Sequence, residues 1–567
     1  MDLINFLDIH YSMNYKIFRL CRNKKTYQKL LKEESFYKLP KTDYLFDIDL
    51  FQFINHIIKN EPYDYALICH DDVILPQEIE RYLEECIESM DSYVGRNNWG
   101  IIGNAGVEIF SKKTLTYISD PHTKFLPPKT KKPKLVESVD GNTMLLNLKN
   151  LRMHGVELPN YISGYHLYDL ILSIESYRKG LVCGVSSLLY VKHLSPGNYE
   201  TFIEASEKNC IQKYFKKNFS NSKITTINGL IEIKREYKNL ENLRYQQDSI
   251  EDVTFNSIKN IFKHHKIELN ILIRIHKPSP KIHRLLESIR ILNLLVDKNV
   301  NISIHLGVNN ISKTKITAYI NELKNTYSDL KIYDIYIPKT NRYPRLQALR
   351  SLAENLPNKL NSYVWFVDYD DYIFPTIEKY LQIILKDSDI TIGESVAFSE
   401  KWSKNDFAPI SSTFNTKFFC SDVDYIYTGN TSVPICSIIY STNIIKSVFK
   451  QNDPIGDYYE DYAILLLASL SGDIRSYPIL FAGISYHGEN TVTEIDRTHW
   501  DYSYTSFMAY IVNRGITNTN TYNILLNYSK KFGELNSELS EFIGFKQGYI
   551  WRILKKYRFF KRRLLRK

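Results

Sequence analysis

The sequence predicts an α/β protein with two tandem units of the same kind, each a mostly parallel sheet with helices on both faces. Strand and helix patterns alternate through the second half of the chain, and one acidic segment occurs twice at the end of an apolar run. The 567 residues are also too many for a single hydrophobic core. We therefore expect at least two domains.

Composition narrows the class of protein. With 44% hydrophobic and 24% charged residues, the chain suits a folded globular protein. Its seven cysteines include no Cys-x-x-Cys pair, which argues against a zinc site or a disulfide framework and favours a reducing compartment. The first residues are acidic, and no long apolar run occurs, so we expect neither a signal peptide nor a spanning helix. The expected location is the cytoplasm.

Apolar periodicity predicts the elements of the second half in order. The expected strands cover 269–275, 302–308, 331–337 and 363–367, and the expected helices cover 282–294, 313–327 and 346–356. In open sheets of this kind, ligands bind beyond the carboxyl ends of the strands. The acids that follow the last strand therefore fall at the expected ligand site.

Three landmarks recur in the same order and at similar spacing. They are paired acids after an apolar run, an aspartate ahead of a glycine, and a histidine: Asp71-Asp72, Asp169 and His193 in one copy, and Asp370-Asp371, Asp461 and His487 in the other. Such a series predicts two copies of one unit. We place them at 1–215 and 266–515, with a polar connector at 216–265 and a helical extension at 516–567.

The residue types suggest a chemistry. Three carboxylates at Asp368, Asp370 and Asp371 repel one another unless a cation or solvent lies between them, and such oxygens suit Mg²⁺ or Mn²⁺. A solvated acidic turn is the alternative. Asp461 opens a helix, where it is either a general base or an acid favoured by the helix dipole. His487 is either a further metal ligand or a structural histidine.

Residues 266–515 resemble the inverting family-two glycosyltransferases, which have the Rossmann-like GT-A fold. The resemblance lies in the arginine that ends the first strand, the segment before the acids, the DXD-like acids, the Glu-Asp pair and the late histidine: Arg274, 341–349, 368–371, 460–461 and His487. The chain departs from the family at Asn309, where an aspartate commonly helps to hold the base and ribose of the donor.

Residues 15–200 resemble a shorter branch of the same superfamily. The matching segments are a His-x-Asp-Val motif, an Asp-Gly pair, a Gly-aromatic-His-x-Tyr-Asp segment and a His-x-Ser-x-Gly segment: 70–73, 140–141, 164–169 and 193–197. Cys69 replaces the acid that the second copy has at Asp368, and Ile171 replaces a further acid of many relatives. The donor-binding half is also short.

The resemblance implies a site for a nucleotide-diphosphate sugar with Mn²⁺ or Mg²⁺. In the second unit, Asp371 and His487 are implied as metal ligands, Asp461 as the catalytic base, and five residues as donor contacts: Arg274, Asn309, Arg342, Asp368 and Asp370. In the first unit, the same roles fall on Asp72 and His193 for the metal, Asp169 for the base and Asp71 for the donor. The implied acceptor is a growing glycan or a lipid-linked glycan of bacterial surface polysaccharide or lipopolysaccharide.

Two other functions stay open. A metal-dependent phosphotransferase also uses paired aspartates after a strand, but it usually needs a hydroxyl residue two positions after the nucleophile and a downstream lysine; the two positions here hold Tyr372 and Ile373. Alternatively, one or both units bind a glycan or nucleotide without turnover, which suits the first unit best.

Positive charge gathers at the end of the chain. Residues 549–567 hold nine of the lysines and arginines and no acid, against a net charge of +10 for the whole chain. Apolar residues recur there at helical spacing, which predicts a basic amphipathic helix on an anionic membrane surface. A solvated tail or a partner-docking helix is the alternative. We expect no nucleic-acid binding, because no basic patch extends into the units.

Overall fold

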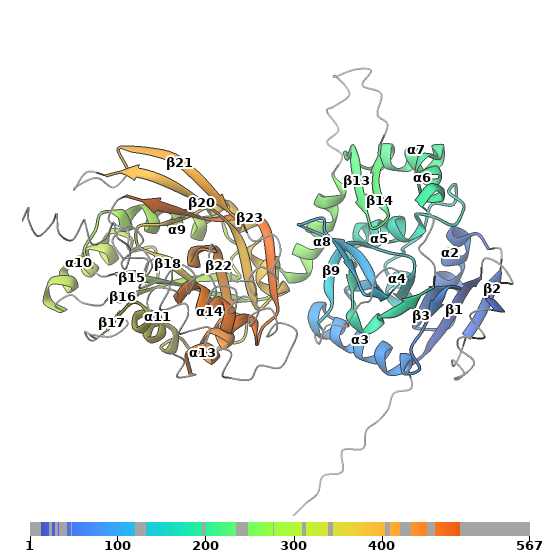
Figure 1. Ribbon diagram of the computed structural model, residues 1–567, viewed down its shortest axis with the longest axis horizontal. Helices are drawn as coiled ribbons and strands as arrows, with labels where there is room; N and C mark the ends of the chain where they lie inside the picture. The colour runs from blue at the N-terminus through green and yellow to red at the C-terminus, as the bar shows by residue number, and fades with distance from the viewer. Residues whose placement is uncertain are drawn as a thin grey trace, which may run out of the picture. The chain divides into compact units, whose positions relative to one another are not determined.

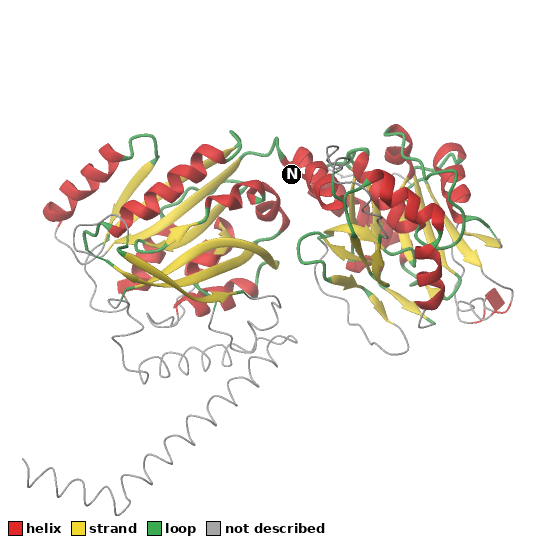
Figure 2. Cartoon of the chain, turned by 90° about the horizontal axis from the view of Figure 1, so that it is seen from above, coloured by secondary structure: helices red, strands yellow, loops and turns green. Residues whose placement is uncertain are grey.

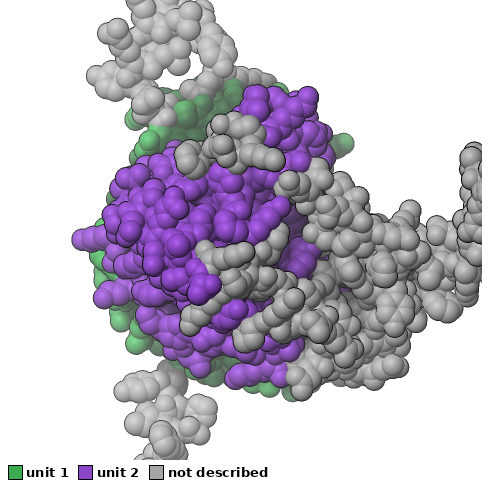
Figure 3. All heavy atoms as spheres, turned by 90° about the vertical axis from the view of Figure 1, so that its left-hand side faces the viewer, with its two compact units in different colours: residues 1–265 green, residues 266–567 purple. Residues whose placement is uncertain are grey.

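The computed structural model describes most of both units. The described residues are 13–21, 25, 27–28, 32, 42–46, 48–119, 132–194, 199–233, 248–275, 277–308, 313–337, 344–402, 409–419, 433–450 and 460–487. The predicted extension at 516–567, its basic tail, and the candidate donor residues Asn309 and Arg342 lie outside them. Contacts between residues divide the chain into two compact units, 1–265 and 266–567, which Figure 3 colours separately.

The second unit has the predicted α/β architecture, and its sheet begins with parallel strands. These strands follow the order β17-β16-β15-β18, and their bounds are β15 (Ile267–Ile275), β16 (Val300–Val308), β17 (Ile332–Tyr336) and β18 (Ser362–Asp368). Each of the four predicted strands is thereby confirmed. This order is that of a Rossmann-like half sheet, in which the first strand lies between the second and the fourth.

The sheet of the second unit continues with mixed pairing. Beyond β18 the order is β22-β20-β23-β19, with β21 paired to β20: β19 (Tyr372–Ile373), β20 (Ile390–Lys401), β21 (Ser411–Phe418), β22 (Ile438–Ser441) and β23 (Ile474–Tyr486). Of these pairs, only β20–β23 is parallel. Parallel pairing therefore dominates the first half of the sheet, and antiparallel pairing the second half.

Helices cover both faces of this sheet. They are α9 (Lys281–Leu295), α10 (Lys313–Thr326), α11 (Pro344–Glu354), α12 (Leu381–Asp387), α13 (Thr442–Lys450) and α14 (Glu460–Ser469), with short 3₁₀ turns η3 (Pro375–Lys379) and η5 (Ile435–Ser437). The three predicted helices are confirmed. Figure 1 shows α9 on one side of the parallel strands and α11, α13 and α14 on the other. A core of apolar side chains from the latter three helices packs on β18 and β22.

The first unit has a related sheet. Its order is β2-β1-β3-β10-β5-β11-β9-β6-β7, and the bounds are β1 (Tyr15–Cys21), β2 (Thr42–Phe46), β3 (Tyr65–His70), β5 (Trp99–Gly103), β6 (Ala105–Glu108), β7 (Thr114–Thr116), β9 (Lys134–Val139), β10 (Thr143–Asn147) and β11 (Val182–Val185). A second small sheet joins β4 (Val73–Ile74), β12 (Val191–His193) and β8 (Ile118–Ser119). The main helices are α2 (Leu50–Asn60), α3 (Ile79–Val94), α4 (Leu148–Met153) and α5 (Tyr168–Arg178), which Figure 1 labels; Figure 2 colours the helices of both units red.

The two sheets share one pairing pattern. Along β2-β1-β3-β10-β5-β11, the senses are parallel, parallel, antiparallel, antiparallel and parallel. The series β16-β15-β18-β22-β20-β23 has the same senses. Among the described strands, β17 has no counterpart in the first unit. In the described residues, the two units thus share the pairing of six strands, and the first unit lacks a counterpart of β17.

Residues 216–265 belong to the first unit by their contacts. Their described part forms a hairpin, β13 (Lys223–Thr226) and β14 (Gly229–Glu232), and the helix α8 (Ile250–Phe262), which packs against α5. Glu251 of α8 forms an ion pair with Lys112 at 3.1 Å and accepts a hydrogen bond from Asn221 at 2.8 Å. In the described residues of both units, every helix is too short or too polar to cross a lipid bilayer.

Candidate active site

The candidate site of the second unit begins where two parallel strands end side by side. Arg274 near the end of β15 stands in register with Asp368, the last residue of β18. The Nε of Arg274 donates to Oδ1 of Asp368 at 3.0 Å, and Arg274 is 7% exposed. Because the carboxyl ends of parallel strands share one edge, a cation and an acid that are far apart in the sequence meet there.

A second arginine completes this charged cluster. Arg274 Nη1 and Arg345 Nη2 reach the same oxygen of Glu460, at 3.2 Å and 3.0 Å. Arg345 also lies 3.9 Å from Asp368. Its position near the start of α11 is three residues after Arg342, so the sequence indicated the segment but not this side chain. The two guanidinium groups thus form ion pairs with the buried side chain of Glu460.

Asp461 differs from its neighbour Glu460. Its Oδ1 is closed off from solvent and has no hydrogen-bond partner among the described residues. Burial, and next the negative charge of Glu460, raise the pKa of Asp461 to about 7, although Arg345 and Arg274 oppose this shift. A carboxylate with an unused oxygen and a pKa near neutrality is suited to accept a proton from a hydroxyl group.

The remaining acids form a second cluster on the same turn. Asp370 Oδ2 lies 2.6 Å from Nε2 of His487, and Asp371 Oδ1 accepts the backbone N–H of Ser485 at 3.2 Å. The Cys436 thiol also hydrogen-bonds to Asp371. Burial, and next the charges of Asp370 and Asp368, raise the pKa of Asp371 well above its ordinary value. A cation at this turn would relieve that repulsion.

These donors fit a divalent cation of the Mg²⁺ or Mn²⁺ kind. Carboxylate oxygens suit both ions, and an imidazole nitrogen favours a transition metal such as Mn²⁺. Within the described residues, no group of three or more acidic, histidine or cysteine side chains is already arranged around one metal position. Ions of this type commonly take several ligands from water and substrate phosphates.

The first unit repeats part of this arrangement. Arg19 of β1 stands in register with Cys69 of β3, as Arg274 does with Asp368. The sequence did not indicate Arg19, which is fully buried. Its partners include two backbone carbonyls, those of His70, at 3.3 Å, and Val73. The residue in register with this arginine is therefore a thiol in the first unit and a carboxylate in the second.

The two late histidines occupy different places in their sheets. His193 pairs in register with Val73, the residue after Asp72, and its Nε2 lies 3.3 Å from Oδ1 of Asp72. In the second unit, the residue after Asp371 pairs instead with Gly483, and His487 lies further along the chain. His487 consequently meets the first acid of its pair, whereas His193 meets the second. Asp71, which was predicted to contact the donor, is fully buried.

Asp169 and Asp461 are each the second residue of their helix, yet their surroundings differ. Both oxygens of Asp169 accept backbone N–H groups, from Gly141 at 2.7 Å and from Leu170 at 2.9 Å. The Tyr168 hydroxyl donates to the carbonyl of Gly141 at 2.9 Å. Burial, and next the charge of Asp140, raise the pKa of Asp169 to about 7. Asp169 therefore holds the Asp140-Gly141 turn in place through its hydrogen bond with Gly141.

Comparisons with known proteins give matches among solved structures alone: no protein-family model matches the chain, and no curated protein matches it. The chain is similar to residues 1–349 of S. aureus TarS in complex with UDP-GlcNAc, at 15% identity and a TM-score of 0.32, over 47% of this chain and 72% of that one. It is also similar to the mannosyltransferase PcManGT from Pyrobaculum calidifontis in complex with GDP-Man and Mn²⁺, at 10% identity and a TM-score of 0.28, over 52% and 84%. Each match spans about half of this chain.

Proposed function

We propose that residues 266–515 form a glycosyltransferase that moves a sugar from a nucleotide-diphosphate sugar to a hydroxyl group of a growing surface glycan, with inversion. The observation that carries the proposal is the oxygen of Asp461 that has no hydrogen-bond partner among the described residues. It lies beside two arginines and an acidic turn at the carboxyl ends of parallel strands. A basic group, a cationic surface and a cluster of oxygen ligands are the parts that such a transfer needs.

Each residue has a distinct part in the proposed reaction. Asp461 removes the proton from the acceptor hydroxyl, whose oxygen attacks the anomeric carbon as the bond to the diphosphate breaks. Arg345, 29% exposed at its side chain, offers positive charge to the donor diphosphate, while the more deeply buried Arg274 holds Asp368 and Glu460 in place. Asp371 and His487, with Asp370 beside them, would hold the Mn²⁺ or Mg²⁺ that neutralises charge on the leaving diphosphate.

The direct test is transfer or hydrolysis of nucleotide sugars. The full chain is incubated with a panel of UDP-, GDP-, CDP- and dTDP-sugars, with Mn²⁺, with Mg²⁺ and with EDTA, and the released nucleotide is measured. We expect turnover of at least one donor, stimulated by one of the two ions. A folded protein that turns over no donor would favour the alternative in which the units bind a glycan or nucleotide without reaction.

The rate of transfer is expected to rise with pH through about 7. Only the ionised carboxylate of Asp461 can accept a proton, and its pKa is raised to about 7. Below that value kcat should fall about tenfold for each pH unit, and above it kcat should level off. Measuring kcat at saturating donor and acceptor between about pH 5.5 and 8.5 checks this. A flat profile across that range would remove Asp461 as the base.

We propose that the first unit binds without catalysing transfer, because both oxygens of Asp169 are committed to the main chain. Asp169→Asn is then expected to leave total donor turnover within about twofold of wild type. The matched substitution at the corresponding helix position, Asp461→Asn, should abolish it. A loss of more than about tenfold in Asp169→Asn would instead show that the first unit is a second transferase.

We also propose that residues 549–567 bring the protein to the cytoplasmic face of an anionic membrane, close to a lipid-linked acceptor. Deletion of these residues is expected to abolish sedimentation with vesicles that contain phosphatidylglycerol, while turnover of a water-soluble acceptor persists. The control is binding to vesicles of phosphatidylcholine alone, which should be weak for both proteins. Equal sedimentation of the deleted and full chains would exclude this role for the tail.

A further inference from the structure

Glu400, at the end of β20, has a buried carboxylate that joins several elements of the second unit. Arg284 Nη1 of α9 donates to its Oε1 at 2.6 Å, and the Ser485 hydroxyl of β23 donates to its Oε2. Trp402 Nε1 adds a third hydrogen bond, at 3.2 Å to Oε2. The Glu400 side chain is 2% exposed. Such a carboxylate is favourable only while its donors stay in place.

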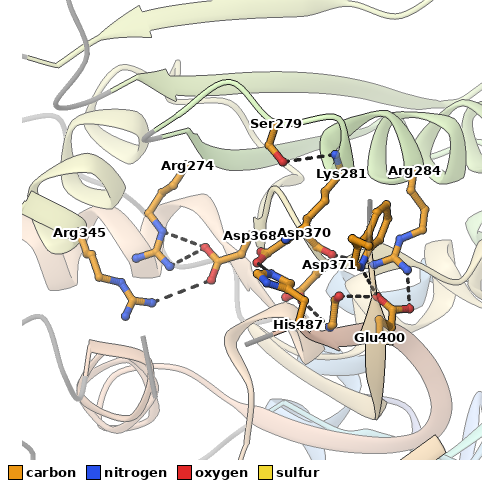
Figure 4. A network of polar contacts seen from close by, with 12 residues as sticks. Arg274, Ser279, Lys281, Arg284, Arg345, Asp368, Asp370, Asp371, Glu400 and His487 are labelled. Atoms are coloured by element: carbon orange, nitrogen blue, oxygen red, sulfur yellow. Dashed lines mark hydrogen bonds and ion pairs between the residues drawn. The ribbon is translucent and has the colours of Figure 1, made fainter. Parts of the chain in front are cut away.

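Arg284 connects this carboxylate to the acidic turn. Its other terminal nitrogen, Nη2, donates to the backbone carbonyl of Asp370 at 2.7 Å (Figure 4). The guanidinium also lies over two aromatic rings, 4.4 Å from the ring centroid of Tyr372 and 4.9 Å from that of Trp402. The Tyr372 ring in turn packs so closely on Gly483 that any Cβ there would collide with it. Arg284 thus has little freedom to leave the turn.

Ser485 connects the same carboxylate to the opposite side of the turn. While its hydroxyl bonds to Glu400, its backbone N–H bonds to Oδ1 of Asp371 at 3.2 Å. Two residues later, His487 reaches Asp370 at 2.6 Å. The contacts therefore close a ring that runs from Glu400 through Arg284 to Asp370, and back through Asp371 and Ser485. The Glu400 carboxylate thus connects, through Arg284 and Ser485, both to the acidic turn and to the strand that leads to His487.

We propose that Glu400, acting through Arg284 and Ser485, is a positioning residue for the acidic turn and for His487. This inference rests on the proposed function and deepens it, because Glu400 sets the spacing between Asp370, Asp371 and His487 without touching substrate. A glutamine has nearly the same shape, but it lacks the charge that pairs with Arg284 and can accept through only one oxygen. Loss of the ring frees the turn and the end of β23 together.

The test compares Glu400→Gln with Glu394→Gln in the full chain. Glu394 is on the same strand and has its own ion pair, with Lys417 at 2.6 Å, so the control makes the same chemical change away from the turn. Hydrogen exchange is measured on peptides covering 368–374 and 480–487 without metal. Mn²⁺ binding is measured by electron paramagnetic resonance with the metal alone, and kcat and donor KM are measured by nucleotide release.

For Glu400→Gln we expect faster hydrogen exchange in both peptides. The affinity for Mn²⁺ and the kcat should each be about 10–100-fold lower than in wild type, and the donor KM should stay within about twofold. Glu394→Gln should match wild type in all of these. A merely structural role predicts lower thermal stability with kcat and Mn²⁺ affinity unchanged. Unchanged exchange at both peptides, or a kcat equal to that of wild type, would overturn the inference.

A milder variant keeps the test decisive if Glu400→Gln does not fold. Ser485→Ala removes the hydroxyl bond to Glu400 and keeps the N–H bond to Asp371, so exchange should increase at 480–487 more than at 368–374. If hydrogen exchange at 480–487 were as slow in Ser485→Ala as in wild type, the inference would again be contradicted. If wild type turns over no donor, the proposed function fails, while the metal-free exchange measurement still decides whether Glu400 positions the turn.

Discussion

Asp461→Asn is expected to lower kcat by about 10²–10⁴-fold, the range that a positioned general base contributes. The asparagine keeps the shape of the side chain but cannot take the proton of the acceptor hydroxyl. Donor KM should change little, because the arginines and the acidic turn are intact. The measurement is nucleotide release at saturating donor and acceptor, and the control is Asp329→Asn, the same change at an exposed ion pair with Arg290.

The same variant should be at least as stable as wild type above pH 7. The pKa of Asp461 is about 7 in the folded protein, above the value of about 4 for an unfolded aspartate. Between these values the unfolded chain ionises while the folded protein stays neutral, so the free energy of unfolding falls as pH rises from about 4 through about 7. In Asp461→Asn, residue 461 does not ionise and adds no such pH dependence to the free energy of unfolding. A lower melting temperature for Asp461→Asn than for wild type at pH 8 would contradict this account of the site.

Arg274→Gln is expected to destabilise the second unit by about 3–5 kcal/mol, because removal of one partner leaves buried charges uncompensated. Asp368 would lose its hydrogen bonds with Arg274, and the 2% exposed Glu460 would lose one of its two arginines. Hydrogen exchange on peptides 267–275 and 362–368 measures the free energy of opening in this unit. Peptide 65–70 of the first unit should be unchanged and serves as an internal reference.

The control for this prediction is Arg290→Gln on the exposed surface of α9. Arg290 pairs with Asp329 at 2.9 Å and with Glu287 at 3.7 Å, and all three side chains are at least 43% exposed. Water already solvates these groups, so the loss of the pairs should leave exchange in the second unit unchanged. If Arg274→Gln behaved like Arg290→Gln, the cluster of Arg274, Asp368 and Glu460 would not stabilise the fold.

Much of the second unit could be predicted because its elements carry local signals. The apolar spacing of 269–275 and 363–367 indicated β15 and β18, and the acids at 368–371 followed directly from the end of a buried strand. The helix that starts at Glu460 was likewise evident from its pattern. The recurrence of these patterns also led us to predict two copies of one unit, but the antiparallel pairing in both sheets was not foreseen.

The partners of the charged residues could not be predicted. Arg345, Glu400 and Ser485 have no motif of their own, and each reaches a residue more than eighty positions away: Arg345 to Glu460, Glu400 to Arg284 and Ser485 to Asp371. The matched histidines misled in a similar way, because similar sequence spacing concealed different strand registers. Spacing along the chain does not specify the register of distant strands.

By itself, the sequence determined the order of strands and helices from 269 to 367 and the placement of acids at strand ends, since burial periodicity and strand length are properties of neighbouring residues. The tertiary structure alone decided which of the two matched aspartates keeps an unused oxygen. Asp169 and Asp461 stand at the same helix position, but the main chain of Gly141 folds back onto the first, whereas no described group bonds to Oδ1 of the second. That difference arises from long-range packing, which decides the hydrogen-bond partners of each carboxylate, while burial raises the pKa of both to about 7.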